Sequence, residues 1–310
     1  MYLLCQTFGK KKILWELKRR LKKFNLDGVL DSNYIAEFIK DAPYSPFKTI
    51  GSTERPDVVA AKLLEGRIAL FLDGTPVVLT LPYLFIENFQ SNDDYYLNYY
   101  YASISRLIRI FGFWLSISIP AIYVALTTFH QELLPVNLVQ SISTARNGVP
   151  LPTVLEAILM VIVFEILRET GLRTPQGIGQ ALSIVGALVI GQAAVDARLI
   201  SAPMIIIVAL SGITGIMLPK IKGAIIYMRF GLLILSSIIG LYGYTLGILL
   251  MIIHLFTIRS FGIPILGSKE EGVMVMEEDL VIRAPWWDML KRPMFMSRDR
   301  KRSSSDGDPE

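Results

Sequence analysis

The segment that decides the fold is residues 152–170, "PTVLEAILMVIVFEILRET". It is apolar enough, and almost long enough, to cross a bilayer, yet it carries Glu156 and Glu165 within its apolar run. A carboxylate in hydrocarbon is costly unless it finds water or a partner, so acids inside membrane helices are candidate functional residues. Whether this segment crosses the membrane also sets the topology of the chain that follows it.

The composition is that of a membrane protein. The chain has 310 residues, of which 52% are apolar and 19% charged, and its mean hydropathy is +0.47. Its single cysteine, Cys5, excludes an internal disulfide, and its two histidines, His130 and His254, leave little for metal ligation. We therefore expect neither a metal ion nor a cofactor.

Residues 1–105 are predicted to be part of a small α+β cytosolic domain. Residues 10–24, "KKKILWELKRRLKKF", have apolar side chains at helical spacing and basic residues between them, so they form an amphipathic helix. This helix either packs its apolar face on a protein core or lies on an anionic membrane surface. In "RIALFLDGTPVVLTLP", Asp73 and Gly74 join two strand-like runs, which predicts a hairpin near residues 67–81.

The next part of the chain, residues 106–259, is predicted to be an α-helical polytopic membrane domain. Apolar runs give about six crossings, at about residues 107–128, 152–168, 181–195, 200–218, 225–241 and 243–258. The last two come from one run, residues 224–258, which as a single helix would be about 52 Å long against a hydrocarbon core of about 30 Å. One tilted crossing with an interfacial piece is the alternative. Residues 260–310 are predicted to be a cytosolic tail, disordered from about residue 294.

Basic residues fix the orientation of these crossings. The first crossing is preceded by arginines, the second is followed by Arg168, a later turn carries Lys220 and Arg229, and the tail is rich in lysine and arginine. Because cytoplasmic connections carry an excess of lysine and arginine, both termini are predicted to be cytosolic and residues 129–151 external. Without a crossing at residues 152–168 the basic turn at Lys220 would be external. This parity supports a crossing there.

Small residues four positions apart recur in the predicted crossings. Such residues let helix backbones approach closely where lipid offers no hydrophobic drive for association. The residues in these patterns are Gly179, Ser183, Ala187, Gly191, Ser211, Gly215, Gly243 and Gly247. The sequence leaves open whether the partner helices belong to the same chain, to a second copy in a homo-oligomer or to another subunit.

The two acids of the opening segment are predicted to have different roles. Glu156 and Glu165 lie nine residues apart, which on a helix places them on opposite faces and about 13 Å apart along the axis. Glu165 has Arg168 three residues on as a local partner, whereas Glu156 has no cation within one helical turn. Glu156 is therefore the better candidate for facing a water-filled route or another subunit.

No catalytic constellation is present in the sequence. It has no Walker-type phosphate loop, no H-E-x-x-H motif and no G-x-S-x-G motif. We therefore do not expect an enzyme. Membrane lipid is an expected partner and nucleic acid is not.

One long block of sequence is distinctive of a known family. Residues 54–96, "ERPDVVAAKLLEGRIALFLDGTPVVLTLPYLFIENFQSNDDYY", resemble the signature block of the A subunit of GerA-type spore germination receptors of endospore-forming bacteria. The segments "GQALSIVGALVIGQAAVDARLISAP" and "IRAPWWDMLKRP" are similar to that family as well. The resemblance runs from about residue 18 to residue 293.

This resemblance implies an integral protein of the spore inner membrane that acts with a permease-like B subunit and a lipoprotein C subunit in nutrient-triggered germination. The B subunit would bind the nutrient, and the A subunit would couple that event to ion release, as a candidate pore-forming subunit. Family members carry a much longer amino-terminal region, so the chain is expected to begin partway through it. The alternatives are a stand-alone secondary transporter, a scaffolding subunit and an inactive truncated remnant. A transporter would show paired broken helices or an internal repeat, and neither is visible.

The residues of the signature block have structural explanations. Pro56 suits the first turn of a helix, Gly66 the end of that helix, and Asp73 with Gly74 the hairpin turn. Structural roles are expected for Glu54, Arg55, Pro56, Asp57, Gly66, Asp73 and Gly74.

Overall fold

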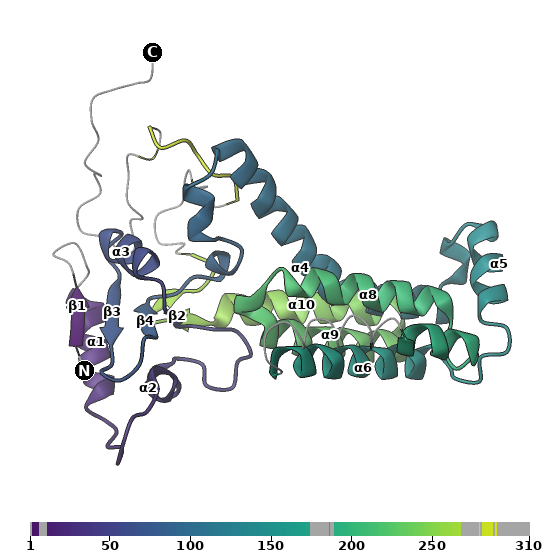
Figure 1. Cartoon of the computed structure of the whole chain (residues 1–310), viewed down its shortest axis with the longest axis horizontal. Helices are drawn as coiled ribbons and strands as arrows, with labels where there is room; N and C mark the ends of the chain where they lie inside the picture. Colours follow the sequence, from purple (N-terminus) through teal and green to yellow (C-terminus); the bar gives the residue numbers. More distant parts are fainter. Residues whose placement is uncertain are drawn as a thin grey trace. The chain divides into compact units, whose positions relative to one another are not determined.

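The computed structural model describes residues 2–5, 11–173, 186, 189–267, 279, 281–287 and 289. The chain divides into two compact units, one made of Met1–Ile108 and Ile253–Glu310 and the other of Arg109–Ile252 (Figure 1). The expected combination of a mainly helical chain with a small sheet is confirmed. The predicted disordered tail from residue 294 lies outside the described residues, as do residues 181–185, 187 and 188 of the predicted crossing at 181–195.

The first unit is built on a four-stranded antiparallel sheet with the strand order β1-β3-β4-β2. Its strands are β1 (Tyr2–Cys5), β2 (Gly51–Thr53), β3 (Ile68–Phe71) and β4 (Val78–Leu81). Strands β3 and β4 form a hairpin in which Ile68 pairs with Leu81. Gly74, in the connection between them, has a φ of 93°, which a residue with a Cβ rarely adopts.

Helices cover both faces of this sheet. The helical elements of the unit are α1 (Lys11–Leu21), α2 (Ser32–Ile39), α3 (Pro56–Leu64), the short 3-10 helices η1 (Phe85–Asn88) and η2 (Asn92–Tyr95), and the start of α4 (Tyr99–Thr128). Leu17 of α1 and Ile35 of α2 pack in one core with Leu70, whereas Val59 of α3 packs with Ala69. Adjacent strand residues point to opposite faces, so neighbouring residues of β3 serve different cores. The amphipathic helix predicted at residues 10–24 corresponds to α1, which packs on a protein core.

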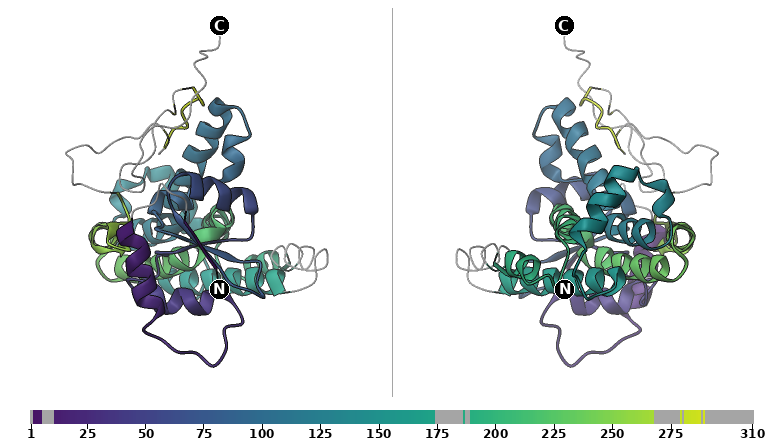
Figure 2. Two further views of the ribbon diagram at one scale, coloured as in Figure 1. Left: turned by 90° about the vertical axis from the view of Figure 1, so that its left-hand side faces the viewer. Right: turned by 90° about the vertical axis from the view of Figure 1, so that its right-hand side faces the viewer.

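The second unit is a bundle of helices. Its elements are the rest of α4, η3 (Gln131–Leu133), α5 (Val136–Ala145), α6 (Thr153–Arg173), a helical stretch at residues 189–196, α8 (Ala202–Ile216), η4 (Pro219–Ile221), α9 (Lys222–Ile239) and most of α10 (Leu241–Thr257). Helices α6, α8, α9 and α10 lie side by side in Figure 1 and are seen nearly end-on in Figure 2. After α10 the chain returns to the first unit through the two-stranded sheet of β5 (Arg259–Ser260) and β6 (Ile263–Pro264).

The long apolar run after Lys222 is divided into two helices at Gly240. This residue has a φ of 65°, in the left-handed region that glycine tolerates best. A Cβ at Gly243 would lie 2.1 Å from the carbonyl oxygen of Leu235, and one at Gly247 would lie 2.6 Å from Leu232 Cδ2. These close pairs show that α10 folds back along α9, with the two backbones in near contact.

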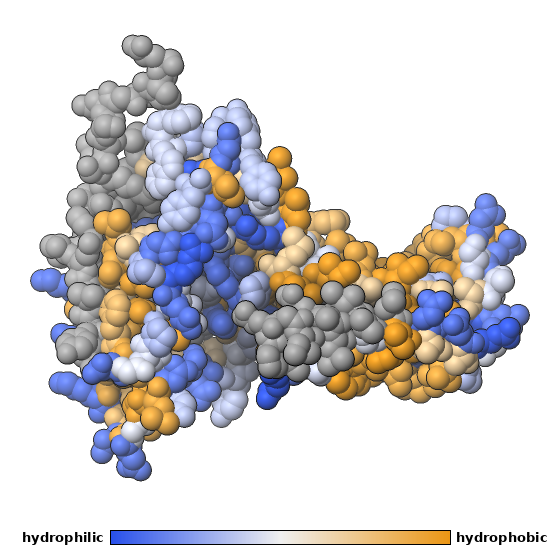
Figure 3. All heavy atoms as spheres, viewed as in Figure 1, coloured by the Kyte–Doolittle hydropathy of each residue, from blue (hydrophilic) through white to orange (hydrophobic). Residues whose placement is uncertain are grey.

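The helical unit is apolar on its outside as well as inside. Among the described residues, two stretches are long and apolar enough to cross a membrane, Tyr99–Thr128 and Pro219–Ile239, while Ala202–Ile216 and Leu241–Thr257 are shorter apolar helices. Figure 3 shows hydrophobic residues spread along the visible face of this unit and hydrophilic residues gathered around α5. These helices do not by themselves give six crossings, so that topology stays a prediction.

Candidate functional site

The helical unit holds a buried ion pair between α6 and α9. Glu165 Oε1 accepts a hydrogen bond from Arg229 Nη1 at 2.8 Å, and the two side chains are 16% and 1% exposed. Arg229 lies seven residues after the start of α9, about 10 Å along its axis. Because an unpaired charge among apolar side chains is strongly unfavourable, each of these residues requires the other.

Arg229 also joins two further helices at the same point. Its Nε donates to the carbonyl oxygen of Ser116 on α4 at 3.0 Å, and its Nη2 donates to Ser116 Oγ at 2.8 Å and to the carbonyl oxygen of Ser211 on α8 at 3.2 Å. Ser116 and Ser211 are themselves linked, because the hydroxyl of each donates to the carbonyl of the other. One guanidinium thus connects α4, α6, α8 and α9.

The space around this guanidinium is closely filled. A Cβ at Gly215 would lie 2.9 Å from Ser116 Oγ and 3.2 Å from Arg229 Nη2, which is tighter than ordinary packing. A Cβ at Gly212, one turn earlier on α8, would lie 2.1 Å from the ring of Phe164. The small residues of α8 therefore let α6 and α4 approach close enough for the buried hydrogen bonds to form.

Arg168 gives this cluster an excess of positive charge. Its Nη1 lies 3.7 Å from Glu165 Oε1, in an ion pair between side chains that are 9% and 16% exposed. The same Nη1 is buried and has no hydrogen-bond partner among the described residues. One carboxylate therefore faces two guanidinium groups, and the pairing is closer with Arg229 than with the sequence neighbour Arg168. We call Ser116, Glu165, Arg168, Ser211 and Arg229 the four-helix polar cluster.

Glu156 lies in a separate buried cluster towards the start of α6. Its carboxylate is fully buried, and Oε1 accepts hydrogen bonds from both the backbone N–H and the hydroxyl of Ser201, the residue before α8, each at 2.5 Å. Arg146 Nε, at the end of α5, lies 3.9 Å from Glu156 Oε2. Within the described structure, Glu156 Oε2, Arg146 Nε and the Tyr123 hydroxyl are buried without hydrogen bonds. This acid thus has a cation partner ten residues earlier, at the end of another helix.

The remaining small residues singled out in the sequence fall in two groups. Gly179, Ser183 and Ala187 lie outside the described residues. Gly191 faces α8, since its Cβ would lie 4.0 Å from Ile205 side-chain atoms, and Gly243 and Gly247 face α9. All of the described positions in this set, Ser211 and Gly215 included, point at another helix of the same chain.

The signature residues of the first unit form a surface network around α3. Arg55 pairs with both Asp57 and Asp93 at 2.8 Å, and Pro56 begins α3. The hydrogen bonds from Arg55 hold the pKa of Asp57 well below its usual range. Glu54 and Asp73 are exposed, and Gly66, like Gly74, has a positive φ.

A second charge cluster in this unit is buried. Glu87 pairs with Arg67 and with Lys62 Nζ, the latter at 2.6 Å, and its Oε1 accepts a hydrogen bond from the backbone N–H of Leu84. Burial of Glu87 opposes its ionisation, but the attraction of the two cations and their hydrogen bonds outweigh it and lower the pKa of Glu87 to about 2. Glu87 therefore stays ionised at all physiological pH values.

The last described residues of the chain pack on the end of the signature block. Arg283 Nη1 donates to the carbonyl oxygen of Leu97 at 2.7 Å, and the Arg283 guanidinium lies over the ring of Tyr95. Arg106 Nη1 donates to Asp279 Oδ1 at 2.6 Å and also pairs with Asp94. Two segments that carry the family resemblance are thus joined in one unit.

Sequence reasoning missed the centre of the four-helix polar cluster. It assigned Arg229 to a basic turn, and it noted Ser211 for helix packing without linking it to Ser116. The available signal was the position of Arg229 inside an apolar run, the same signal that drew attention to Glu165. Metal chemistry gains no support, because the described part of the chain contains no group of three His, Cys, Asp or Glu side chains that could hold an ion.

Comparison with known proteins agrees with the resemblance. The chain matches the family described as Bacillus/Clostridium GerA spore germination protein over residues 2–295. It is 47% identical over 289 residues to the membrane protein YfkQ of Bacillus subtilis, a match that covers 93% of this chain and 56% of YfkQ. It is 46% identical over 308 residues to spore germination protein KA of Bacillus subtilis, covering 98% of this chain and 57% of KA.

A further relative, spore germination protein A1 of Bacillus subtilis, is 38% identical over 279 residues, which is 89% of this chain and 58% of A1. The chain therefore spans less than two thirds of the length of these relatives. No solved structure matches it. The matched region contains the signature block, both buried charge clusters of the helical unit and the segment around Arg283. The family is non-enzymatic. On this match the chain belongs to the GerA family of spore germination proteins.

Proposed function

We propose that this chain acts as the A-type subunit of a nutrient germinant receptor in the spore inner membrane, where it couples nutrient sensing to ion release. The family match over residues 2–295 carries the proposal. The apolar helical unit supports it, because exposed Ile206, Ile213 and Ile238 on its outside suit contact with lipid. The partners would be a permease-like B subunit, which binds the nutrient, and a lipoprotein C subunit.

The helical unit would cross the membrane about six times, with both termini in the cytosol. Helix α6 has 21 residues, about 32 Å, which is long enough for a hydrocarbon core of about 30 Å. The fold-back at Gly240 supports two crossings in place of one tilted crossing. Helix α5 and the hydrophilic residues around it would then lie outside, in the segment between the first two crossings.

The four-helix polar cluster is the proposed coupling element. Arg229 has its hydrogen bonds distributed over three other helices, so displacement of any one of them by a fraction of a helical turn breaks a buried charge-assisted bond. Such closely packed contacts favour discrete arrangements over continuous deformation. A shift imposed by a partner subunit on one helix would therefore be passed to the others. The finer proposal is that this rearrangement opens a pore to which the chain contributes.

A chimera tests the proposal without depending on the regions that lie outside this chain. This chain replaces the matching segment of protein KA in Bacillus subtilis spores that lack KA. Restored KA-dependent germination supports the proposal. Failure of a chimera that immunoblotting finds in the inner membrane at the normal level, together with its B and C partners, would refute it.

The alternatives make different predictions. A stand-alone secondary transporter would take up a substrate in liposomes that contain only the purified chain. A scaffolding subunit would tolerate the charge-neutral substitutions Glu156→Gln and Glu165→Gln with no change in germination and normal protein levels. An inactive remnant would assemble with no partner. The buried charges favour an active subunit over a scaffold, because ion pairs of this kind are poor sources of stability compared with apolar packing.

A further inference from the structure

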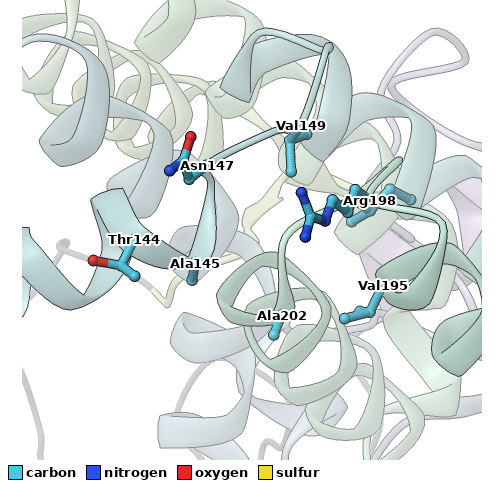
Figure 4. A pocket seen from close by; sticks show the side chains of 8 residues that line it. Thr144, Ala145, Asn147, Val149, Val195, Arg198 and Ala202 are labelled. Carbon is cyan, nitrogen blue, oxygen red and sulfur yellow. The ribbon is translucent and has the colours of Figure 1, made fainter.

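A cavity of about 410 Å³ lies at the end of the helical unit that carries α5. It is formed by the last turn of α5, the loop after it, and the turn that leads into α8 (Figure 4). Its volume falls in the range of small-molecule sites, roughly 300–1,000 Å³. The lining combines the apolar side chains of Val149 and Val195 with the polar side chains of Thr144 and Asn147.

Arg198 supplies the charge in this cavity. Figure 4 shows its side chain reaching into the space between the loop of Asn147 and Val149 and the turn of Val195 and Ala202. Arg198 is exposed, and among the residues that the structure describes no carboxylate pairs with its guanidinium and no acceptor is hydrogen-bonded to it. The solvent-accessible cavity therefore presents a positive charge that no described side chain compensates.

The backbone holds Arg198 in this position at some cost. Its φ is 52°, in the left-handed region that arginine seldom adopts, and its N–H donates to the carbonyl oxygen of Val195 at 2.9 Å. Opposite it, Gly148 has a φ of 88°, and a Cβ there would lie 3.2 Å from both Cδ and Nη1 of Arg198. The loop thus packs directly on the arginine side chain, and a Cβ at Gly148 would be in tight contact with it.

The charged residues next to the cavity lining, Arg146 and Glu156, pair with each other. Arg146 lies between the cavity-lining residues Ala145 and Asn147, and Ser201 lies between Ile200 and Ala202. These two residues are committed to the buried carboxylate of Glu156, as an ion pair and as hydrogen-bond donors. The carboxylate of Glu156 thus has its ion pair with Arg146, and no ion pair joins it to Arg198 in the described structure.

We propose that this cavity binds a small anion, with a carboxylate or phosphate group held by the guanidinium of Arg198. The planar guanidinium can donate two parallel hydrogen bonds to either group, and the start of α8 at Ala202 adds the positive end of a helix dipole. The side chains of Val149 and Val195, which also line the cavity, would contact the remainder of the ligand. The phosphate can come from a free solute or from the headgroup of an anionic lipid.

Binding to the full chain in nanodiscs tests this site and does not require a working receptor. Acetate is followed by saturation-transfer NMR and inorganic phosphate by ³¹P line broadening, in discs of zwitterionic lipid. A third arm compares discs with and without phosphatidylglycerol, with the lipid retained by the purified protein measured by mass spectrometry. With one arginine as the main contact, the dissociation constant for a free anion is expected to be on the order of 1 mM.

Arg198→Gln should weaken saturable binding at least tenfold, and Arg198→Lys, which keeps the charge but not the planar fork, should weaken it less. Arg173→Gln is the matched control, because Arg173 is 81% exposed on α6 and its loss removes the same charge elsewhere. Equal melting temperatures of the variants exclude a folding defect. Retention of phosphatidylglycerol alone, abolished by Arg198→Gln, would identify the lipid headgroup as the source. Absence of saturable binding in all three arms, or equal binding by wild type and Arg198→Gln, would overturn the proposal.

Discussion

Arg229→Met removes the guanidinium at the centre of the four-helix polar cluster while keeping a long apolar side chain. Breaking a buried ion pair by removing one partner costs roughly 3–5 kcal/mol, because the other charge is left without compensation. Arg168 lies 3.7 Å from Glu165 and can take over part of the pairing, which places the expected loss near the lower end, at about 3 kcal/mol.

The assay is equilibrium unfolding of the purified chain in mixed micelles, followed by circular dichroism. The double variant Glu165→Gln with Arg229→Met should be less destabilised than Arg229→Met alone, because it removes the orphaned carboxylate as well. Arg173→Met serves as the control on α6, because an exposed ion pair such as that of Arg173 with Glu169 contributes little to stability. If Arg229→Met costs no more than this control, or if the double variant is as destabilised as Arg229→Met or more so, the account of the buried ion pair is wrong.

Three further predictions concern other parts of the fold. Gly243→Ala places a Cβ against the backbone oxygen of Leu235 and should destabilise the protein by about 2 kcal/mol in thermal unfolding. Gly223→Ala on α9 is the control, because Gly223 has open space around it, and it should be neutral or slightly stabilising. The pKa of Glu87 is about 2 in the folded protein against an ordinary value of 4.5, so its ionised form should contribute about 3 kcal/mol of stability above pH 4.5, which is lost as the pH falls towards 2. If Glu87→Gln unfolds in acid with the same pH dependence as the wild type, this prediction is contradicted. Glu156→Gln keeps the acceptor for Ser201 but turns an amide towards Arg146, so it should cost about 1–3 kcal/mol in the same unfolding assay; a loss below that of Arg173→Met would count against the buried cluster.

Local patterns predicted the local structure well, because they depend on near neighbours. The pair Asp73 and Gly74 lies in the β3–β4 connection, and Pro56 begins α3. In both cases the backbone preference of a single residue type is enough to fix the feature. Helical spacing likewise identified the buried face of α1, although the choice between a protein core and a membrane surface needed the structure.

The partners of buried charges could not be predicted in the same way. Glu165 has an arginine three residues on, yet its closer partner is Arg229, 64 residues away. From the sequence, no cation was found for Glu156 because only residues within one turn of the same helix were considered, whereas Arg146 lies at the end of α5. Which helix faces meet is set by tertiary packing, and a single sequence carries no direct signal of it. An arginine inside an apolar run is nevertheless as informative as an acid in that position.

The most direct test of the account is nutrient-triggered ion release from spores whose KA protein carries this chain as its matching segment, measured as the conductance of the suspension. We predict that the unsubstituted chimera restores ion release. A chimera with both Glu165→Gln and Arg229→Gln, present in the membrane at the same level, should lose nutrient control, releasing ions either without nutrient or not at all. Normal nutrient-dependent release by the doubly substituted chimera would contradict the assignment of this charge pair as the coupling element.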